Sequence, residues 1–205
     1  GGMNQRWFRD KFCNVEMMAE AQGCGNAYEM ISRQVENVPA GCDGLVMLPH
    51  LSGSMPPDGN AKAKGVYFGF TLQHTKAHFM RAIYESLGYI LKRNIDSLSD
   101  MGIEVKEIRS LGGGSKSKVW NQIKADINQV TLETVKSVEA ASLGAAILAG
   151  KAVGIFDSIE SAVDSMVEVK DRTVPQPENR QVYEEGYQMY RKLFADLTEC
   201  FERTR

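Results

Sequence analysis

The sequence predicts an α/β fold, in which helices pack on a mostly parallel sheet, and three observations support this. Extended and helical segments alternate in the second half of the chain in the order strand, helix, strand, helix. The first of these strands, 108–111, leads through the glycines at 112–114 directly into a helix. A stripe of aromatic residues near the C-terminus predicts a helix that lies on its own domain.

Two helices are predicted at the N-terminal end of the chain. Apolar residues about one helical turn apart predict an amphipathic helix over 6–21, and a shorter helix is predicted over 27–35. The residues expected on the apolar face of the first helix are Trp7, Phe8, Phe12, Val15 and Met18.

The segment 39–64 is dense in Gly, Pro, Ser and Asp, which predicts an irregular crossing. It contains the strand-like stretch 45–48, so we expect it to be packed on the domain. A helix is predicted over 75–93, where Arg81 and Glu85 lie one turn apart. We expect these two residues to form a surface ion pair on a solvated face.

The most informative feature is the glycine turn at 112–114, between the strand 108–111, expected to be buried, and a helix predicted over 117–129. Glycine lets a ligand approach the main chain, and the N–H groups and dipole of a following helix favour anionic oxygens. Two standard phosphate motifs are not met, because a P-loop needs an earlier glycine and G-x-G-x-x-G needs glycine at Ser117. From these residues alone, the alternative to a phosphate-binding site is a plain turn that connects a strand to a helix and binds no ligand.

The remaining segments continue the alternation. A strand is predicted over 131–135 and a helix of small residues over 139–146, where Gly144 costs about 1 kcal/mol relative to alanine. Close packing against a neighbouring helix offsets this cost, so packing is its expected role. The tail 179–203 is predicted to dock on its own domain rather than in a coiled coil with a partner. Its stripe consists of Tyr183, Tyr187, Tyr190, Phe194, Leu197 and Phe201.

The composition is that of an ordinary globular protein. A chain of 205 residues can bury a substantial core, either as one large domain or as a piece of a larger protein. With 43% hydrophobic residues, 24% charged residues and a net charge of −2, we expect neither disorder nor a nucleic-acid partner. No apolar run approaches the ~20 residues that cross a bilayer, and no signal peptide is recognisable. We therefore expect a cytoplasmic protein without a membrane partner.

Cysteine and histidine patterns give little support to disulfides or metals. The four cysteines are far apart and form no C-x-x-C pair, so free thiols are expected. His74 and His78 are four residues apart, but the glutamate of H-E-x-x-H is missing and no third ligand is evident. No metal site is predicted from this chain.

Three segments carry a family resemblance. The first has G-x-Y-x-G-F over 65–70 and H-F-x-x-A-I-Y-E over 78–85. The second has L-G-G-G-S-K-S-x-x-W-x-Q-x-x-A-D over 111–126 and continues as E-A-A-x-x-G-A-A over 139–146. The third has G-G-x-x-x-x-W-F-R-D over 1–10. With these segments the chain resembles the C-terminal part of FGGY-family carbohydrate kinases, most closely the xylulose kinase branch.

The chain departs from the family pattern at a few positions. Phe70 stands where an aliphatic residue is usual, and Ser54 and Met55 stand where many members have Glu-Arg. Arg6 occupies a position that is often glutamine. These departures concern the sugar or loop contacts and the detail of the nucleotide contacts.

The resemblance implies an actin-like ATPase fold of the ribonuclease H-like class. The chain, 1–205, would be its C-terminal domain, a mixed sheet flanked by helices that is incomplete at the N-terminal side. ATP and Mg²⁺ are the implied cofactors. The residues implied to bind the nucleotide are Gly2, Arg6, Gly112, Gly113, Gly114 and Ser117.

No catalytic residue and no metal ligand is implied within this chain. In the family the general-base aspartate and most sugar contacts lie upstream of the region that is resembled here. The aspartates that are not at the base position are Asp10, Asp43, Asp58 and Asp126. The chain alone is therefore expected to be inactive.

Two functions remain open at this point. The chain is either part of an ATP-dependent sugar kinase, whose partners are ATP, a small sugar and an N-terminal domain, or an isolated nucleotide-binding or interaction module. A structural α/β domain without ligand is a third reading, and a homodimer is left open. D-xylulose is the leading substrate, ahead of another pentulose, gluconate or glycerol.

Overall fold

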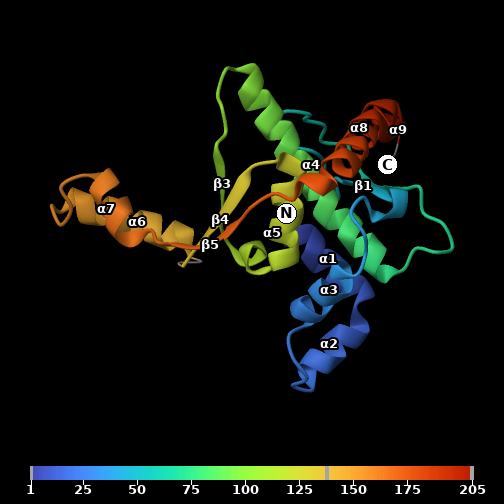
Figure 1. Ribbon diagram of the computed structural model, residues 1–205, viewed down its shortest axis with the longest axis horizontal. Helices are drawn as coiled ribbons and strands as arrows, with labels where there is room; N and C mark the ends of the chain where they lie inside the picture. Colours follow the sequence, from blue (N-terminus) through green and yellow to red (C-terminus); the bar gives the residue numbers. More distant parts are fainter. Residues whose placement is uncertain (1, 137–138, 204–205) are drawn as a thin grey trace.

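Figure 1 shows the computed structural model of the chain, which describes residues 2–136 and 139–203. Gly1, part of one of the motifs above, lies outside this range. Helices and strands follow one another as α1 (Gly2–Phe12), α2 (Asn14–Ala21), α3 (Ala27–Glu36), β1 (Val46–Pro49), β2 (Gly65–Phe68), α4 (Lys76–Asp100), β3 (Glu107–Ser110), α5 (Lys118–Asn128), β4 (Thr131–Val135), α6 (Ala140–Ala152), α7 (Ile159–Met166), β5 (Val169–Thr173), α8 (Arg180–Asp196) and α9 (Thr198–Arg203).

The strands form two small sheets. β3 and β4 pair in parallel, with Glu107 opposite Thr131, and β4 pairs with β5 antiparallel; β1 and β2 form a separate antiparallel pair. The three-stranded sheet is therefore mixed, as the family resemblance implies, and the mostly parallel sheet expected from the order of strands and helices is wrong. Helix α5 forms the crossover that a parallel pair requires. The two helices α6 and α7 instead return the chain to the same end of the sheet, so β5 runs back along β4 (Figure 1).

Strand β3 lies at an edge of this sheet. It pairs only with β4 among the described strands, so the other edge is free. Glu107 and Arg109 are exposed, and Ile108 and Ser110 are half-buried. The expectation of a buried strand is therefore wrong, since one strand neighbour covers only part of it.

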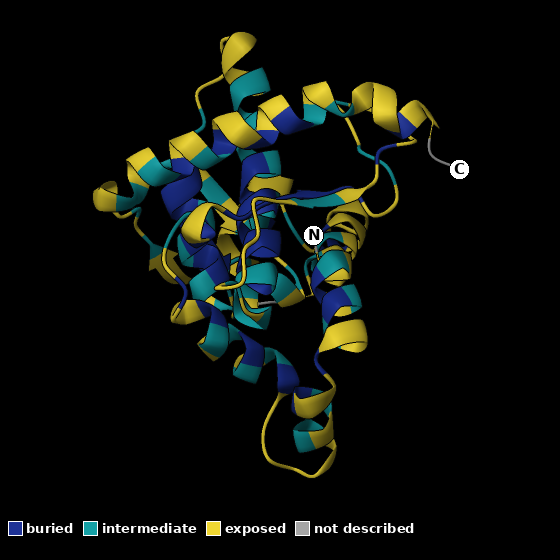
Figure 2. Ribbon diagram, turned by 90° about the vertical axis from the view of Figure 1, so that its right-hand side faces the viewer, coloured by how far each residue is buried: buried dark blue, intermediate teal, exposed yellow. Residues whose placement is uncertain are grey.

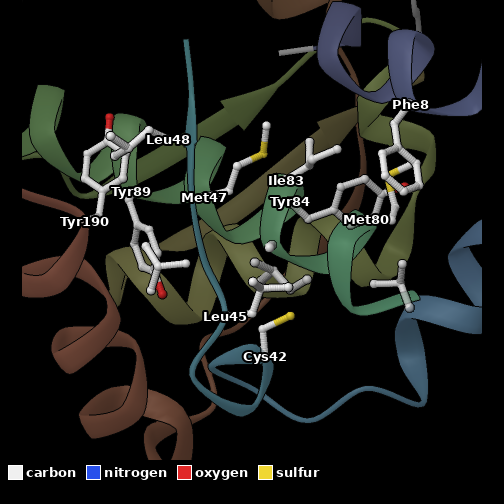
Figure 3. Packing of buried hydrophobic residues seen from close by; sticks show 14 of the residues in the cluster. Phe8, Cys42, Leu45, Met47, Leu48, Met80, Ile83, Tyr84, Tyr89 and Tyr190 are labelled. Carbon is white, nitrogen blue, oxygen red and sulfur yellow. The ribbon is translucent and has the colours of Figure 1, made fainter. Parts of the chain in front are cut away.

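Helix α4 is the centre of the core. It contacts α1, α3, α5, α8 and β1, and so holds both halves of the chain together. In the close view, Leu45 and Met47 from the segment around β1 lie beside Ile83 and Tyr84 of α4 (Figure 3). The buried residues of α4 lie between Met80 and Tyr89, and the helix continues to Asp100, beyond the predicted end at position 93.

The N-terminal helix predicted over 6–21 is divided at Cys13, whose backbone is not helical (φ −115°, ψ 47°). The part before the break buries Phe8 in the core. The rest of the expected apolar face is not covered, because Phe12 just before the break and Val15 and Met18 beyond it have exposed fractions of 53%, 74% and 63%. The single amphipathic helix is therefore wrong in both extent and burial, whereas α3 confirms the helix predicted over 27–35.

Arg81 and Glu85 are buried, contrary to the expected surface pair, with exposed fractions of 7% and 2%. Arg81 Nε donates to Glu85 Oε1 at 2.8 Å. Its other guanidinium nitrogens donate to the carbonyl oxygens of Val35 and Val38 and to the Tyr183 hydroxyl. The end of α3 and the start of α8 cover this face of α4. Their carbonyl and hydroxyl groups accept hydrogen bonds from Arg81 and so compensate for the water that the buried pair has lost.

The C-terminal tail docks on its own domain, as predicted. Helix α8 packs against α4, α5 and β1, and α9 follows after a break at Leu197. Tyr183, Tyr187, Tyr190 and Phe201 are buried, and the remaining members of the predicted stripe pack against them. Coloured by burial, α8 has a buried side toward the core and an exposed outer side (Figure 2).

Helices α6 and α7 form an arm that extends away from the sheet (Figure 1). Gly144 does not have the expected packing role, because a Cβ placed there meets no atom within 4 Å. The closely packed glycine of this arm is Gly150, which lies against the ring of Phe156. In the described part of the chain, no helix combines the length and hydrophobicity needed to cross a membrane.

Candidate functional site

The glycine turn after β3 presents open main chain. Gly112 has a φ of +77°, which side chains other than glycine rarely adopt, and a short 3₁₀ turn follows over Gly113–Lys116. A Cβ placed at Gly112 or Gly113 meets no atom within 4 Å. The Ser115 hydroxyl donates to the Gly112 carbonyl oxygen at 2.7 Å and fixes the turn from inside. A ligand can therefore approach the backbone on the outer side.

The third glycine of the turn has a different role. A Cβ at Gly114 would lie 2.8 Å from Cζ3 of Trp120, so any side chain there would displace the indole ring. Trp120 is 3% exposed and stacks on Tyr84, with ring centroids 4.7 Å apart and an angle of 9° between the planes. Because Gly114 has no side chain, the turn packs directly against the Trp120 ring, which is itself stacked on Tyr84.

Ser117 begins helix α5 as its N-cap. Its hydroxyl oxygen accepts a hydrogen bond from the Trp120 amide at 3.3 Å, and Asn121 Nδ2 donates to the Ser115 carbonyl oxygen at 2.7 Å. The first amides of a helix carry partial positive charge and favour anionic groups. Here the turn that is open to ligand leads directly into such a helix start.

Helix α1 carries the two other predicted site residues. Gly2 and Arg6 are both exposed. The buried residue Gln5 of the same helix donates from Nε2 to the hydroxyl of Tyr84, the residue that stacks on Trp120. Gly112, Gly113, Gly114 and Ser117 therefore form one continuous turn, while Gly2 and Arg6 are linked to it through Gln5 and Tyr84.

Lys124 is a charged neighbour of the turn that sequence reasoning missed. Its Nζ lies 3.3 Å from the Ser110 hydroxyl, at the end of β3, and 4.6 Å from the centroid of the Trp120 ring. Burial removes the ammonium group from water and lowers the pKa of Lys124 to about 8. The sequence could have indicated Lys124, because it lies four residues after Trp120 and so on the same face of the helix.

Two residues of the motif over 111–126, Gln122 and Asp126, line a hollow of about 510 Å³. It lies between the end of α3, α5 and the start of α8. The Asp126 carboxylate accepts hydrogen bonds from Gln122 Nε2, the Gln176 amide and Asn179 Nδ2, at 2.7 to 2.8 Å. Asp126 therefore ties α5 to the segment that leads into α8.

The two histidines act in local structure. His78 Nδ1 accepts from the Thr75 amide and completes a capping box at the start of α4, while its Nε2 lies 3.1 Å from Asp43 Oδ2. His74 Nδ1 accepts from the Thr71 amide. Within 2–136 and 139–203, no three His, Cys, Asp or Glu residues are grouped as a metal site.

Comparison with known proteins identifies the relatives of this fold. A family model described as "FGGY family of carbohydrate kinases, C-terminal domain" matches residues 1–153. A xylulose kinase of Staphylococcus epidermidis is 35% identical over 193 residues, which are 94% of this chain and 37% of that protein. A gluconokinase of Bacillus licheniformis is 34% identical, covering 98% of this chain and 39% of that protein.

A solved structure gives the same result for the fold. The xylulose kinase of Rhodospirillum rubrum superposes with a TM-score of 0.84 at 28% sequence identity, over 99% of this chain and 39% of that one. The chain thus spans less than two fifths of the length of these relatives. The similarity includes both the glycine turn and α1.

Proposed function

The chain belongs to the FGGY family of carbohydrate kinases, and we propose that it is the C-terminal, nucleotide-binding portion of an ATP-dependent sugar kinase. The observation that carries this proposal is the open glycine turn at the start of α5, where Gly112 and Gly113 leave the main chain free for a ligand. Residues 1–205 would form one C-terminal domain of a cytoplasmic enzyme. The mixed α/β fold, shared with the solved sugar kinases, supports this assignment.

The residues of the turn fit a nucleotide. The amides of Gly113 and Gly114 and the Ser117 hydroxyl would contact adenosine and its phosphates, and Gly2 and Arg6 would close the opposite side. A guanidinium group such as that of Arg6 provides several hydrogen-bond donors and a permanent charge. These residues bind and orient the nucleotide, and positioning contributes much of the catalysis in phosphoryl transfer.

Mg²⁺ would not be held by a dedicated set of side chains from this chain, since the described residues offer no such group. It commonly keeps several water ligands and binds through substrate phosphates with one or two carboxylates. When bound, it neutralises charge on the transferring phosphoryl group.

The base that accepts the proton of the sugar hydroxyl would come from outside this chain. The four aspartates named above as not at the base position each have a local partner: Asp10 binds Arg9, Asp43 binds His78, Asp58 binds Arg93, and Asp126 binds Gln122. An N-terminal domain of the complete protein would supply the base and most contacts to the sugar.

D-xylulose is the proposed substrate, with xylulose 5-phosphate as product. The 35% identity to a xylulose kinase supports it. Gluconate is the second candidate, because a gluconokinase is 34% identical over almost the same part of the chain. As the family resemblance implies, the residues that would distinguish these sugars are expected mostly in the N-terminal domain.

Titration calorimetry with ATP and Mg²⁺ tests the nucleotide site. Gly113→Asp should abolish binding, because the carboxylate would stand in the open turn and repel phosphate, while the space around Gly113 lets the fold tolerate it. Gly144→Asp is the matched control, since its Cβ also meets no atom within 4 Å but lies on the arm. Equal binding by wild type and Gly113→Asp would contradict the assignment of this turn.

The activity is tested on the complete protein that contains this chain. ADP release is measured with D-xylulose, D-gluconate and glycerol in turn, and the highest kcat/KM is expected for D-xylulose. A protein that binds ATP but phosphorylates none of the three would instead support an isolated nucleotide-binding module.

A further inference from the structure

The hydroxyl of Tyr84 stands where three helices meet behind the glycine turn. Tyr84 belongs to α4 and is fully buried. Gln5 of α1 donates to its hydroxyl at 2.5 Å, and Ser32 of α3 and Ser117 of α5 hydrogen bond with each other at 3.3 Å beside it. Burial raises the pKa of Tyr84, while hydrogen bonds with Ser32, Gln5 and Ser117 act in the opposite direction.

The ring of Tyr84 reaches the turn by a second route. It stacks in parallel on Trp120, and the edge of that indole supports Gly114. The ring and the hydroxyl of one residue thus contact two separate supports of the turn: Trp120 beneath the glycines and Ser117 at the helix start.

The same hydroxyl is also connected to α1, the other side of the site. Gln5, which it holds, lies one residue before Arg6 and three residues after Gly2 on α1. A shift of α1 relative to α4 therefore moves Gly2 and Arg6 relative to the glycine turn. The phenol oxygen is the polar connection between the two sides.

We propose that Tyr84 is a positioning residue of the nucleotide site, which sets the separation between α1 and the glycine turn through its hydroxyl. This inference rests on the proposed function, because it assumes that ATP binds between Gly2 or Arg6 and the turn. Tyr84 does not contact the nucleotide; it acts through Gln5, Ser117 and Trp120.

A tyrosine buried for packing alone does not need this arrangement, and the same helix contains one. Tyr89 of α4 is 2% exposed, and its hydroxyl has no hydrogen-bond partner among the described residues. Tyr84→Phe and Tyr89→Phe therefore each remove one buried hydroxyl group from the same helix. Only the first change removes a connection to α1 and to the Ser117 cap.

The test measures ATP affinity of both variants by calorimetry and the kinetics of the complete kinase. Tyr84→Phe should raise the Kd and the KM for ATP about threefold to tenfold, the range of one or two lost hydrogen bonds. The KM for the sugar and kcat should stay within about twofold, because neither the chemistry nor the sugar site is changed. Tyr89→Phe should leave all four constants unchanged.

A double-mutant cycle identifies the route. Gln5→Met removes the donor from α1, so combining it with Tyr84→Phe should raise the Kd for ATP no more than the larger single change. Additive effects, or equal ATP affinities of Tyr84→Phe and Tyr89→Phe, would overturn the positioning role while leaving the nucleotide site intact. If the wild-type protein itself binds no ATP, both the proposed function and this inference fail.

Discussion

The Arg81 guanidinium and the Glu85 carboxylate form an ion pair inside the protein, with Nε and Oε1 2.8 Å apart. Glu85 also accepts a hydrogen bond from the Gly41 amide, and Arg81 reaches Tyr183 on α8. The pair therefore connects α4 with the loop after α3 and with the C-terminal helix. It is a structural junction of the core rather than a group that faces solvent.

Arg81→Met should destabilise the protein strongly. It leaves Glu85 buried with one remaining donor, the Gly41 amide, and breaking a buried pair from one side costs about 3–5 kcal/mol. Urea unfolding measures this cost as a fall in the free energy of unfolding. The double variant Arg81→Met with Glu85→Leu should recover part of it, because no uncompensated charge remains.

An exposed pair of the same spacing provides the control. Lys192 and Asp196 are also four residues apart, with Nζ and Oδ2 2.7 Å apart, but both side chains are more than half exposed. Lys192→Met should change the free energy of unfolding by less than about 1 kcal/mol. If Lys192→Met and Arg81→Met lowered the free energy of unfolding equally, burial would not be what makes the Arg81 pair important.

Gly186 should not tolerate alanine, although alanine normally stabilises a helix. A Cβ at Gly186 would overlap the hydroxyl oxygen of Tyr89, which packs against α8. Gly186→Ala should therefore cost about 1–3 kcal/mol in thermal or urea unfolding. Adding Tyr89→Phe should restore most of the loss, because it removes the overlapping atom.

Gly144→Ala tests the same substitution where space is free. No atom lies within 4 Å of a Cβ at this position of α6, so the helix propensity of alanine should raise stability by up to about 1 kcal/mol. A destabilising Gly144→Ala would mean that the arm is packed against another surface in solution.

The sequence predicted many of the helices and strands but not α7 or β5, and it was a poor guide to what covers each element. The docking stripe of Tyr183, Tyr187 and Tyr190 was predicted because the residues that pack are apolar and regularly spaced. Arg81 and Glu85 follow the same helical spacing as an exposed pair. Their burial depends on carbonyl groups contributed by distant segments, which no local pattern contains.

For the site, the sequence located the turn but not its support. The glycines and Ser117 are adjacent in the chain, so their association is a local property. Tyr84 and Gln5 come from two other helices and meet only in the folded protein. The family resemblance placed α1 at the same site; spacing alone did not.

Ser117 can be tested for its structural and its binding role separately. Ser117→Ala removes the N-cap of α5 and should cost about 1 kcal/mol of stability. Ser117→Asp keeps a capping oxygen, so stability should be preserved, but its negative charge should weaken ATP binding measured by calorimetry. Ser158→Ala, at the N-cap of α7, should cost a similar amount of stability and leave ATP binding unchanged.

Lys124 should make stability depend on pH in a defined direction. Burial lowers the pKa of Lys124 to about 8 from an ordinary value of 10.5, so between these two pH values the unfolded chain binds more protons than the folded one. Stability therefore rises with pH over this window, by up to about 3 kcal/mol from this residue. Below pH 8 the ammonium group is charged in both states, and its burial cost is present in full.

Lys124→Met removes this dependence, so the difference in unfolding free energy between wild type and variant should shift steadily in favour of wild type from pH 8 to 10.5. Tyrosines that titrate in the same range are common to both proteins and cancel in the difference. A difference that stays constant from pH 8 to 10.5 would contradict this prediction and would mean that the Lys124 ammonium group is solvated beside the turn.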